Sequence, residues 1–382
     1  IRLELPKEGE NPYACASDIL KMWQDKGILK IEDKPAIYIY EEEFSVGNTR
    51  KSIKGIIARV QLEEFSKGII LPHEFTLSKA KEDRLNLMKA TNCNFSQIYA
   101  LYMDEKHTTL ATIDEQSKAK ADLEFTDETG VTHRLWIETD EEIIAKLVAD
   151  FADRKLYIAD GHHRYETALN YRNYCRENGI SKPGDPQDFQ MIYLVDMEHP
   201  GLVVFPTHRL VRDLPNFDKE AVLEKCSEFF YIDEKEGTDT MEDDLKKLYD
   251  EGKKAFGFYC GKGEWFLLTL KNIDIMSQML PDVSKASQSL DVSVLHTLIL
   301  EKIFGIDKEN MAKQINLTYT KFFTEAIDGV DKGEFQCSFV LNPTRVTEIR
   351  DVAAAGEKMP QKSTYFYPKM ITGMVMNNLG VD

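Results

Sequence analysis

The sequence has no long hydrophobic run, although 42% of its residues are hydrophobic. A helix needs about 18 or more consecutive apolar residues to cross a bilayer, and no segment approaches that length. No signal peptide is visible either, so we expect a cytoplasmic protein with no membrane partner. The hydrophobic residues of a 382-residue chain are enough to fill more than one core, which favours two or three domains.

Cysteine pairs and an excess of basic charge are also missing. The six cysteines are scattered without a C-x-x-C motif, which is typical of reduced thiols in a cytoplasmic protein. The formal net charge is −17. A protein that slides along DNA needs a basic face to release counterions from phosphates, so we expect no nucleic-acid partner.

The sequence does have a concentration of reactive side chains at one strand-to-helix turn. The short apolar run from Leu156 to Ala159 predicts a buried strand. Asp160-Gly161 supplies turn chemistry and a carboxylate for the helix N-cap. Apolar residues at a period of three to four then predict a helix from about His162 to Asn178.

The first turn of this helix is predicted to bind an anion. His162, His163 and Arg164 lie beside unpaired backbone N–H groups and the positive end of the helix dipole. Arg164 adds a planar fork of donors that suits phosphate or carboxylate. The sharper interpretation is a phosphate site. The alternative is that Asp160 only caps the helix and that the two histidines are surface residues.

This turn resembles a phosphate-binding element of a known fold. Gly161 to Arg164, followed by Ala168, fits the G-x-x-R-x-x-x-A pattern of the ParB and sulfiredoxin-like fold. Asp160 to Arg164 is similar to the D-G-H-x-R element of the free-serine kinases built on that fold. The resemblance implies that the turn holds nucleotide phosphates. Sulfiredoxin chemistry is not expected, because His162 and His163 stand where a cysteine is required.

The whole chain also resembles a large prokaryotic family of unassigned function that shares this element. Its other landmarks span nearly the full length, and they are Leu71 to Thr76, Lys81 to Arg84, Phe205 to Arg209, Leu290 to His296, and Met359 to Phe366. Such a match names relatives rather than a reaction.

Periodicity and turn signals predict an α+β protein with a mixed sheet, and the resemblance implies a ParB/sulfiredoxin-like fold for its N-terminal domain. Helices are expected at 15–26, 78–90, 140–151, 219–230, 239–251 and 291–304, and strands at 35–40, 52–62, 97–103, 122–125, 131–137, 190–195, 255–260 and 265–270. The linker-like Asp213 to Asn216 suggests a boundary near Arg212. Together with the resemblance, this boundary implies a nucleotide-binding domain over residues 1–212 and a smaller α+β domain over 213–382 that completes the cleft.

Three local expectations accompany this outline. The run Glu41 to Glu43 is expected to be a solvated edge. Asp83 and Arg84 are expected to form a structural ion pair. His296, in the most apolar helix, is expected to be a hydrogen-bonded core histidine.

Phosphoryl transfer requires groups that hold the phosphates, a carboxylate for Mg²⁺ and a base for the attacking hydroxyl. The segment Gly161 to Arg164 supplies the predicted phosphate-binding residues. Asp160 is predicted to bind Mg²⁺ or to orient a histidine. Glu74 is the predicted base, by analogy with a glutamate from an earlier loop in the serine kinases. The predicted catalytic residues are thus Glu74, Asp160 and His162.

Two later segments are predicted to add polar groups to the nucleotide site. A proline fixes a turn ahead of Thr207, His208 and Arg209 and aims these side chains into a shared pocket. Lys362 and Ser363 belong to a basic loop that either closes over an anion or lies on the surface. The surrounding segment is similar to a P-loop but has no second glycine, so a P-loop is not expected.

Three functions remain open on the sequence. The first is a Mg²⁺-dependent kinase that uses a nucleotide such as ATP, ADP or CTP to phosphorylate a small hydroxylated metabolite, for example a free amino acid. The second is a hydrolase whose metal is held by His73, Asp160, His162 and His163, although no H-x-x-x-H pair supports it. The third is a non-catalytic nucleotide-binding regulator, which turnover would distinguish from the first. The apolar run from Met370 to Met376 suits a core or an interface, which leaves a homo-oligomer open.

Overall fold

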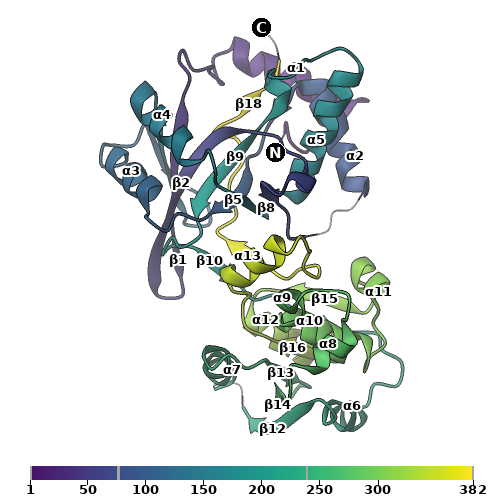
Figure 1. Cartoon of the computed structure of the whole chain (residues 1–382). Coiled ribbons are helices and arrows are strands. Elements are labelled where there is room, and N and C mark those ends of the chain that lie inside the picture. The colour runs from purple at the N-terminus through teal and green to yellow at the C-terminus, as the bar shows by residue number, and fades with distance from the viewer. Residues whose placement is uncertain (1, 75–77, 238–239, 381–382) are drawn as a thin grey trace. The chain divides into compact units, whose positions relative to one another are not determined.

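The computed structural model of the chain describes residues 2–74, 78–237 and 240–380 (Figure 1). The chain divides into two compact units. Unit 1 comprises Ile1–Val203 and Pro368–Asp382, and unit 2 comprises Val204–Tyr367.

The predicted boundary near Arg212 falls inside unit 2. The linker-like residues that follow it form a turn in which Asp213 and Asn216 have φ of 56° and 55°. A tight turn and a linker favour the same residue types, so composition alone does not separate them. The return of the last residues to unit 1 is not predicted from the sequence.

Unit 1 is built around an eight-stranded mixed sheet. Its strands, in hydrogen-bonded order, are β3 (Ile70–Leu71), β8 (Leu156–Asp160), β5 (Ile98–Tyr102), β9 (Phe189–Asp196), β2 (Thr49–Gln61), β1 (Ile37–Val46), β7 (Thr132–Glu138) and β6 (Leu123–Thr126). The β3–β8 and β5–β9 pairs are parallel, and the other pairs are antiparallel. The prediction of an α+β protein with a mixed sheet is confirmed.

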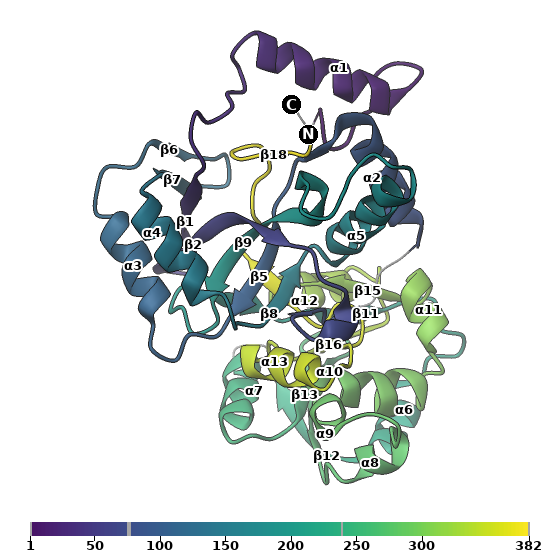
Figure 2. The ribbon, with the colours of Figure 1, turned by 45° about the horizontal axis from the view of Figure 1, so that its top comes forward.

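Helices cover one face of this sheet (Figure 2). The helices of unit 1 are α1 (Pro12–Asp25), α2 (Ser78–Thr91), α3 (Thr108–Gln116), α4 (Glu141–Asp150) and α5 (His162–Glu177), with short 3₁₀ turns at Phe65–Lys67 and Pro186–Asp188. Alternate apolar residues of the strands pack against α3, α4 and α5, while α2 packs on α5. A small sheet pairs β4 (Cys93–Asn94) with β18 (Asn377–Asn378) and so attaches the C-terminal segment to unit 1.

The prediction of a solvated edge at Glu41 to Glu43 is wrong. These residues belong to β1, which lies between β2 and β7, and Glu42 is only 1% exposed. The hydroxyl of Tyr40 lies 3.1 Å from Oε1 of Glu42 and 2.7 Å from Nδ1 of His133. Nε2 of His133 lies 3.2 Å from Oδ2 of Asp127. We call these four linked groups the Glu42 chain.

The Glu42 chain contains one carboxyl that titrates near neutral pH. Burial raises the pKa of Glu42 to about 7. Burial also acts to raise the pKa of Asp127, but hydrogen bonds from Thr129, His133 and Val131 outweigh it and lower that pKa to about 2. Asp127 is therefore ionised at neutral pH, whereas Glu42 exchanges its proton there.

Unit 2 contains a six-stranded antiparallel sheet. Its strands, in hydrogen-bonded order, are β12 (Phe230–Glu236), β14 (Glu264–Leu270), β13 (Ala255–Tyr259), β16 (Cys337–Val340), β11 (His208–Val211) and β15 (Leu317–Thr320). A two-stranded sheet pairs β10 (Val203–Phe205) with β17 (Tyr365–Tyr367). The helices are α6 (Lys219–Cys226), α7 (Met241–Asp250), α8 (Ile275–Met279), α9 (Lys285–Gln288), α10 (Asp291–Val294), α11 (Lys308–Lys313), α12 (Phe323–Asp331) and α13 (Val346–Ala354).

Two predicted helices of unit 2 differ from the structure. The helix predicted over 219–230 ends at Cys226, because the apolar residues near Phe230 enter strand β12 instead. The helix predicted over 291–304 is α10 followed by a π-helical segment, Leu295–Glu301. His296 in that segment is 6% exposed and hydrogen-bonded to Arg209, so it is the predicted core histidine.

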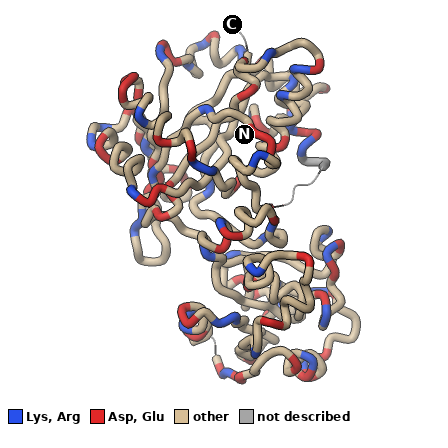
Figure 3. The backbone as a smooth tube through the Cα atoms, in the orientation of Figure 1, with Lys and Arg blue, Asp and Glu red and all other residues tan. Residues whose placement is uncertain are grey.

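Charges of both signs are interspersed along the chain in each unit (Figure 3). All six cysteines are free thiols. In residues 2–74, 78–237 and 240–380, no helix has both the length and the apolar character that a membrane span requires.

Candidate functional site

The turn after β8 starts α5 without a side-chain cap. Gly161 occupies the N-cap position, with φ of 96°, and α5 begins at His162. The prediction that Asp160 caps the helix is therefore wrong. A Cβ at Gly161 would lie 3.0 Å from the guanidinium of Arg164, and its left-handed conformation is unfavourable for other residues. The glycine leaves the first backbone N–H groups of α5 without an acceptor from the N-cap side chain.

Two cations flank the carboxylate of Asp160. Nη2 of Arg164 and Nζ of Lys369 each lie 3.6 Å from its Oδ2. Arg164 is held in place because its Nη1 donates to the carbonyl of Gln97 at 2.5 Å. The Asp160 side chain is 44% exposed, and 3.6 Å contacts are ion pairs rather than hydrogen bonds. Mg²⁺ is often held by one carboxylate together with phosphate oxygens, so the metal role of Asp160 stays a prediction.

His162 points into the protein rather than toward a ligand on the turn. Its ring is 4% exposed, and its Nε2 accepts a hydrogen bond from the backbone N–H of His73 at 3.1 Å. The two rings pack edge to face with centroids 4.7 Å apart. The side chain of His162 therefore holds the segment that carries Glu74 against the turn, while its backbone N–H belongs to the first turn of α5.

His73 is an uncharged partner in this arrangement. It is fully buried, and its Nδ1 lies 2.6 Å from the carbonyl of Ile158 in β8. Because a carbonyl only accepts, Nδ1 carries a proton. Burial lowers the pKa of His73 to about 4. Two hydrogen bonds thus join the loop after β3 to β8 and α5, through His73 and His162.

The metal-hydrolase arrangement is not formed by these histidines. Nε2 of His162 and Nδ1 of His73 are both engaged with backbone groups. Within the described part of the chain, no three His, Cys, Asp or Glu side chains are grouped so that they could hold a metal ion.

The remaining predicted residues of unit 1 lie around the same turn. Glu74 follows His73 and is half-buried, as is His163 in the first turn of α5. Residues 75–77 of the landmark at Leu71 to Thr76 lie outside the described residues. Lys81 donates to Glu166 at 2.7 Å and so connects α2 to α5.

The predicted ion pair between Asp83 and Arg84 is wrong. Asp83 accepts a hydrogen bond from the hydroxyl of Tyr13, and Arg84 donates to the carbonyl of Glu4. Adjacent residues on a helix do not face each other, so side chains at such positions find partners elsewhere.

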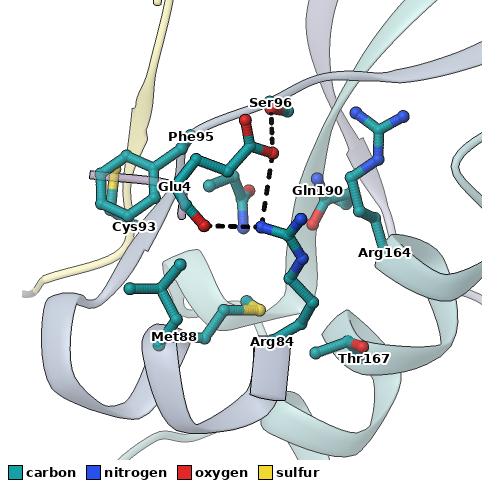
Figure 4. A pocket seen from close by; sticks show the side chains of 11 residues that line it. Glu4, Arg84, Met88, Cys93, Phe95, Ser96, Arg164, Thr167 and Gln190 are labelled. Atoms are coloured by element: carbon teal, nitrogen blue, oxygen red, sulfur yellow. Dashed lines mark hydrogen bonds and ion pairs between the residues drawn. The ribbon is translucent and has the colours of Figure 1, made fainter. Parts of the chain in front are cut away.

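Arg164 also lines a cavity of about 40 Å³ (Figure 4). Glu4 and Arg84 form part of its wall, and Ser96 donates a hydrogen bond to Glu4. Such a volume holds about one to a few water molecules, whereas small-molecule pockets measure several hundred Å³. A nucleotide at the turn would therefore lie on its solvent side, outside this cavity.

The other predicted ligand-binding residues, Thr207, His208, Arg209, Lys362 and Ser363, lie in unit 2. Successive residues of a strand point to opposite faces, so His208 packs near Phe323 while Arg209 contacts His296. The expectation that the side chains of His208 and Arg209 share one pocket is therefore wrong. Ser363 donates to the carbonyl of Pro360 at 2.5 Å, within the predicted basic loop.

The sequence does not predict the presence of two residues at the turn, which are Gln97 and Lys369. Gln97 contributes only a backbone carbonyl, which carries no sequence signal. Lys369 belongs to the C-terminal segment that returns to unit 1. No local pattern predicts a contact between residues so far apart in the chain.

The protein is a two-unit α+β protein in which Arg164 and Lys369 both lie beside Asp160 at the turn between β8 and α5. The chain belongs to the family described as "Protein of unknown function (DUF1015)", whose model matches residues 1–293. No curated protein matches the chain.

Several solved structures are similar to the chain at low sequence identity. A conserved hypothetical protein from Pyrococcus furiosus is 14% identical, with 85% of this chain and 95% of that chain covered and a TM-score of 0.39. A variant of a free serine kinase in complex with ADP is 12% identical, with 81% and 88% covered and a TM-score of 0.40. A free serine kinase in complex with AMP is 13% identical, with 81% and 86% covered and a TM-score of 0.40.

Proposed function

We propose that this protein binds a nucleotide at the turn between β8 and α5 and transfers a phosphoryl group to a small hydroxylated metabolite, such as a free amino acid. The observation that carries the proposal is the start of α5 at Gly161, flanked by Arg164 and Lys369. Backbone N–H groups at a helix start and nearby cations are the groups that hold phosphate.

Each part of the turn has a defined role in this proposal. The N–H groups of the first turn of α5, with Arg164 and Lys369, bind the phosphates. Asp160 would hold Mg²⁺, which would supply positive charge to the phosphate oxygens. Glu74 is the base that accepts the proton of the attacking hydroxyl. His73 and His162 are positioning residues, because they hold the loop of Glu74 through backbone hydrogen bonds.

Replacing Glu74 by glutamine tests the catalytic part of the proposal. The carboxylate accepts a proton and the amide does not, so Glu74→Gln is expected to lower kcat by about 10²- to 10⁴-fold. Nucleotide affinity is expected to stay unchanged, because Glu74 does not hold the phosphates. The measurement is formation of the phosphorylated acceptor from ATP, ADP or CTP with Mg²⁺ and a series of hydroxylated amino acids, alongside calorimetric nucleotide binding.

The matched control is Glu105→Gln, which changes an exposed glutamate of unit 1. It is expected to keep the wild-type rate. If nucleotide binds but none of the three donors phosphorylates an acceptor above the background rate, the kinase proposal fails and a non-catalytic regulator is supported. Equal rates in wild type and Glu74→Gln would refute the role of Glu74 alone.

A further inference from the structure

Unit 2 contains a fully buried arginine in its sheet. Arg209 lies in β11, and its side chain is 0% exposed. It pairs with Tyr319 of β15 and with Phe339 of β16. Directly paired residues share one face of a sheet, so these three side chains are neighbours. The guanidinium lies over the ring of Tyr319, 5.2 Å from its centroid.

The hydrogen-bond partners of Arg209 are all uncharged. Its Nε and Nη2 donate to Nε2 of His296 at 3.3 and 3.1 Å, and Nη2 also donates to the carbonyl of Lys362 at 3.1 Å. Its Nη1 donates to the carbonyl of Thr207. His296 accepts from Arg209, and burial followed by the arginine's charge lowers the pKa of His296 well below its ordinary value.

Among the residues that the structure describes, no carboxylate forms an ion pair with Arg209. Burial lowers the pKa of Arg209 to about 10, so the guanidinium is still charged at neutral pH. Buried charges in proteins are normally paired, because removing a charge from water carries a large penalty that neutral partners offset only in part. Arg209 is therefore a buried positive charge in unit 2 that has no ion-pair partner among the described residues.

Two residues that contact Arg209 each have a buried hydroxyl with no hydrogen-bond partner in the described part of the protein. They are Oγ1 of Thr207 and the hydroxyl of Tyr319. Buried polar atoms without partners are rare, and each requires a physical explanation. Here both belong to residues that already contact the guanidinium, one through its backbone carbonyl and the other through its ring.

The carbonyl that covers Arg209 comes from a strained residue. Lys362 has φ of 58°, a left-handed conformation that is unfavourable for lysine. Its neighbour Ser363 anchors the same loop, because the carbonyl of Ser363 accepts a hydrogen bond from Thr344 at 2.7 Å. A neutral carbonyl held in a strained conformation is a weaker partner for a guanidinium than an oxyanion is.

We propose that unit 2 contains an oxyanion-binding site centred on Arg209, with the hydroxyls of Thr207 and Tyr319 as further donors. The ligand is a carboxylate or phosphate group of a small molecule. It replaces the carbonyl of Lys362 on the guanidinium, and the loop of Lys362 moves to admit it. This site stands on unit 2 alone and does not rest on nucleotide binding at the turn of unit 1.

The test titrates the full chain with inorganic phosphate and, separately, with L-lactate, against sodium chloride at equal ionic strength. One readout is the ¹⁵N resonance of the Nε–H group of Arg209, assigned by its absence in Arg209→Lys. The other is the melting temperature, which rises when a ligand binds the folded state alone. A saturable response to phosphate assigns a phosphate ligand, and a response to lactate assigns a carboxylate ligand.

Three variants locate the response. Tyr319→Phe removes only the hydroxyl and is expected to weaken binding about tenfold. Phosphate also binds the turn of unit 1 in the proposed function, so Arg209→Lys is compared in an Arg164→Ala background that weakens that site, and it is expected to abolish the rise in melting temperature that remains there. Arg212→Lys changes an arginine of the same unit whose side chain is 42% exposed, and it is expected to bind as wild type does.

Absence of a saturable response to both anions would overturn the proposal. Unchanged affinity in Tyr319→Phe, or an undiminished rise in melting temperature when Arg209→Lys is added to Arg164→Ala, would overturn it as well. If Arg209→Lys does not fold, the Nε–H signal is assigned as the one that Tyr319→Phe displaces most, and the titrations of wild type and Tyr319→Phe still decide the question.

Discussion

The Arg164→Ala variant is expected to bind Mg²⁺-nucleotide about a hundredfold more weakly than wild type. A charge-assisted hydrogen bond to phosphate contributes about 1.5 to 3 kcal/mol, and every 1.4 kcal/mol is about tenfold in affinity. Removal of the arginine also leaves Asp160 with Lys369 as its remaining cation at the turn. Calorimetric titrations of ATP, ADP, CTP and GTP with Mg²⁺ measure the effect.

The matched control for this prediction is Arg176→Ala. Arg176 lies in the last turn of the same helix, where it pairs with Asp188 at 2.6 Å. It is expected to leave nucleotide affinity unchanged. Thermal unfolding without nucleotide measures any structural cost of losing the bond from Arg164 to the carbonyl of Gln97. Unchanged affinity in Arg164→Ala, or an equal loss in Arg176→Ala, would contradict the assignment of the turn.

The second large effect is expected for Glu42→Gln and depends on pH. Burial raises the pKa of Glu42 from 4.5 to about 7, so folding favours the protonated carboxyl. The stability that this group contributes is fully present below pH 4.5 and is lost as the pH rises through about 7. The difference between the two values corresponds to about 3 kcal/mol. Glutamine is uncharged throughout, so the variant should match wild type in acid and exceed it above neutral pH by about that amount.

Urea unfolding at a series of pH values measures this difference, with Glu124→Gln as the control. The side chain of Glu124 is 57% exposed in the same sheet, so its replacement is expected to show no comparable rise with pH. His73 changes the free energy of unfolding with pH in the opposite direction. Only the difference in this free energy between Glu42→Gln and wild type therefore reports on Glu42 alone. The lowered pKa of His73, about 4, makes its contribution fully present above pH 6.5 and lost as the pH falls through about 4. A constant difference between Glu42→Gln and wild type from acid to alkaline pH would contradict the raised pKa.

The elements around the turn were predictable because their signals are local. A short apolar run followed by glycine predicted the strand and the start of the helix, and the structure has β8 at Leu156–Asp160 and α5 at His162–Glu177. The hairpin of β6 and β7 was predicted for the same reason, since alternating residues flank a turn sequence. These patterns depend only on neighbouring residues.

Features that depend on pairing across the sheet were not predictable from local patterns. Glu42 was expected to be exposed because three glutamates in a row are usually solvated, yet β1 has a strand on each side. The direction of the His162 side chain was equally hidden, because a helical pattern does not fix which ring nitrogen meets the backbone of His73. Lys369 reaches the turn only because the C-terminal segment returns to unit 1.

Amide hydrogen exchange with and without saturating ADP and Mg²⁺ tests the nucleotide-binding turn most directly. Exchange is expected to slow in the peptide that contains residues 160–166, because phosphate would accept hydrogen bonds from the N–H groups of the first turn of α5. Peptides from the last turn of α5 should exchange as before. Absence of nucleotide binding, or bound ADP that slows exchange elsewhere and leaves this peptide unchanged, would contradict a nucleotide site at this turn.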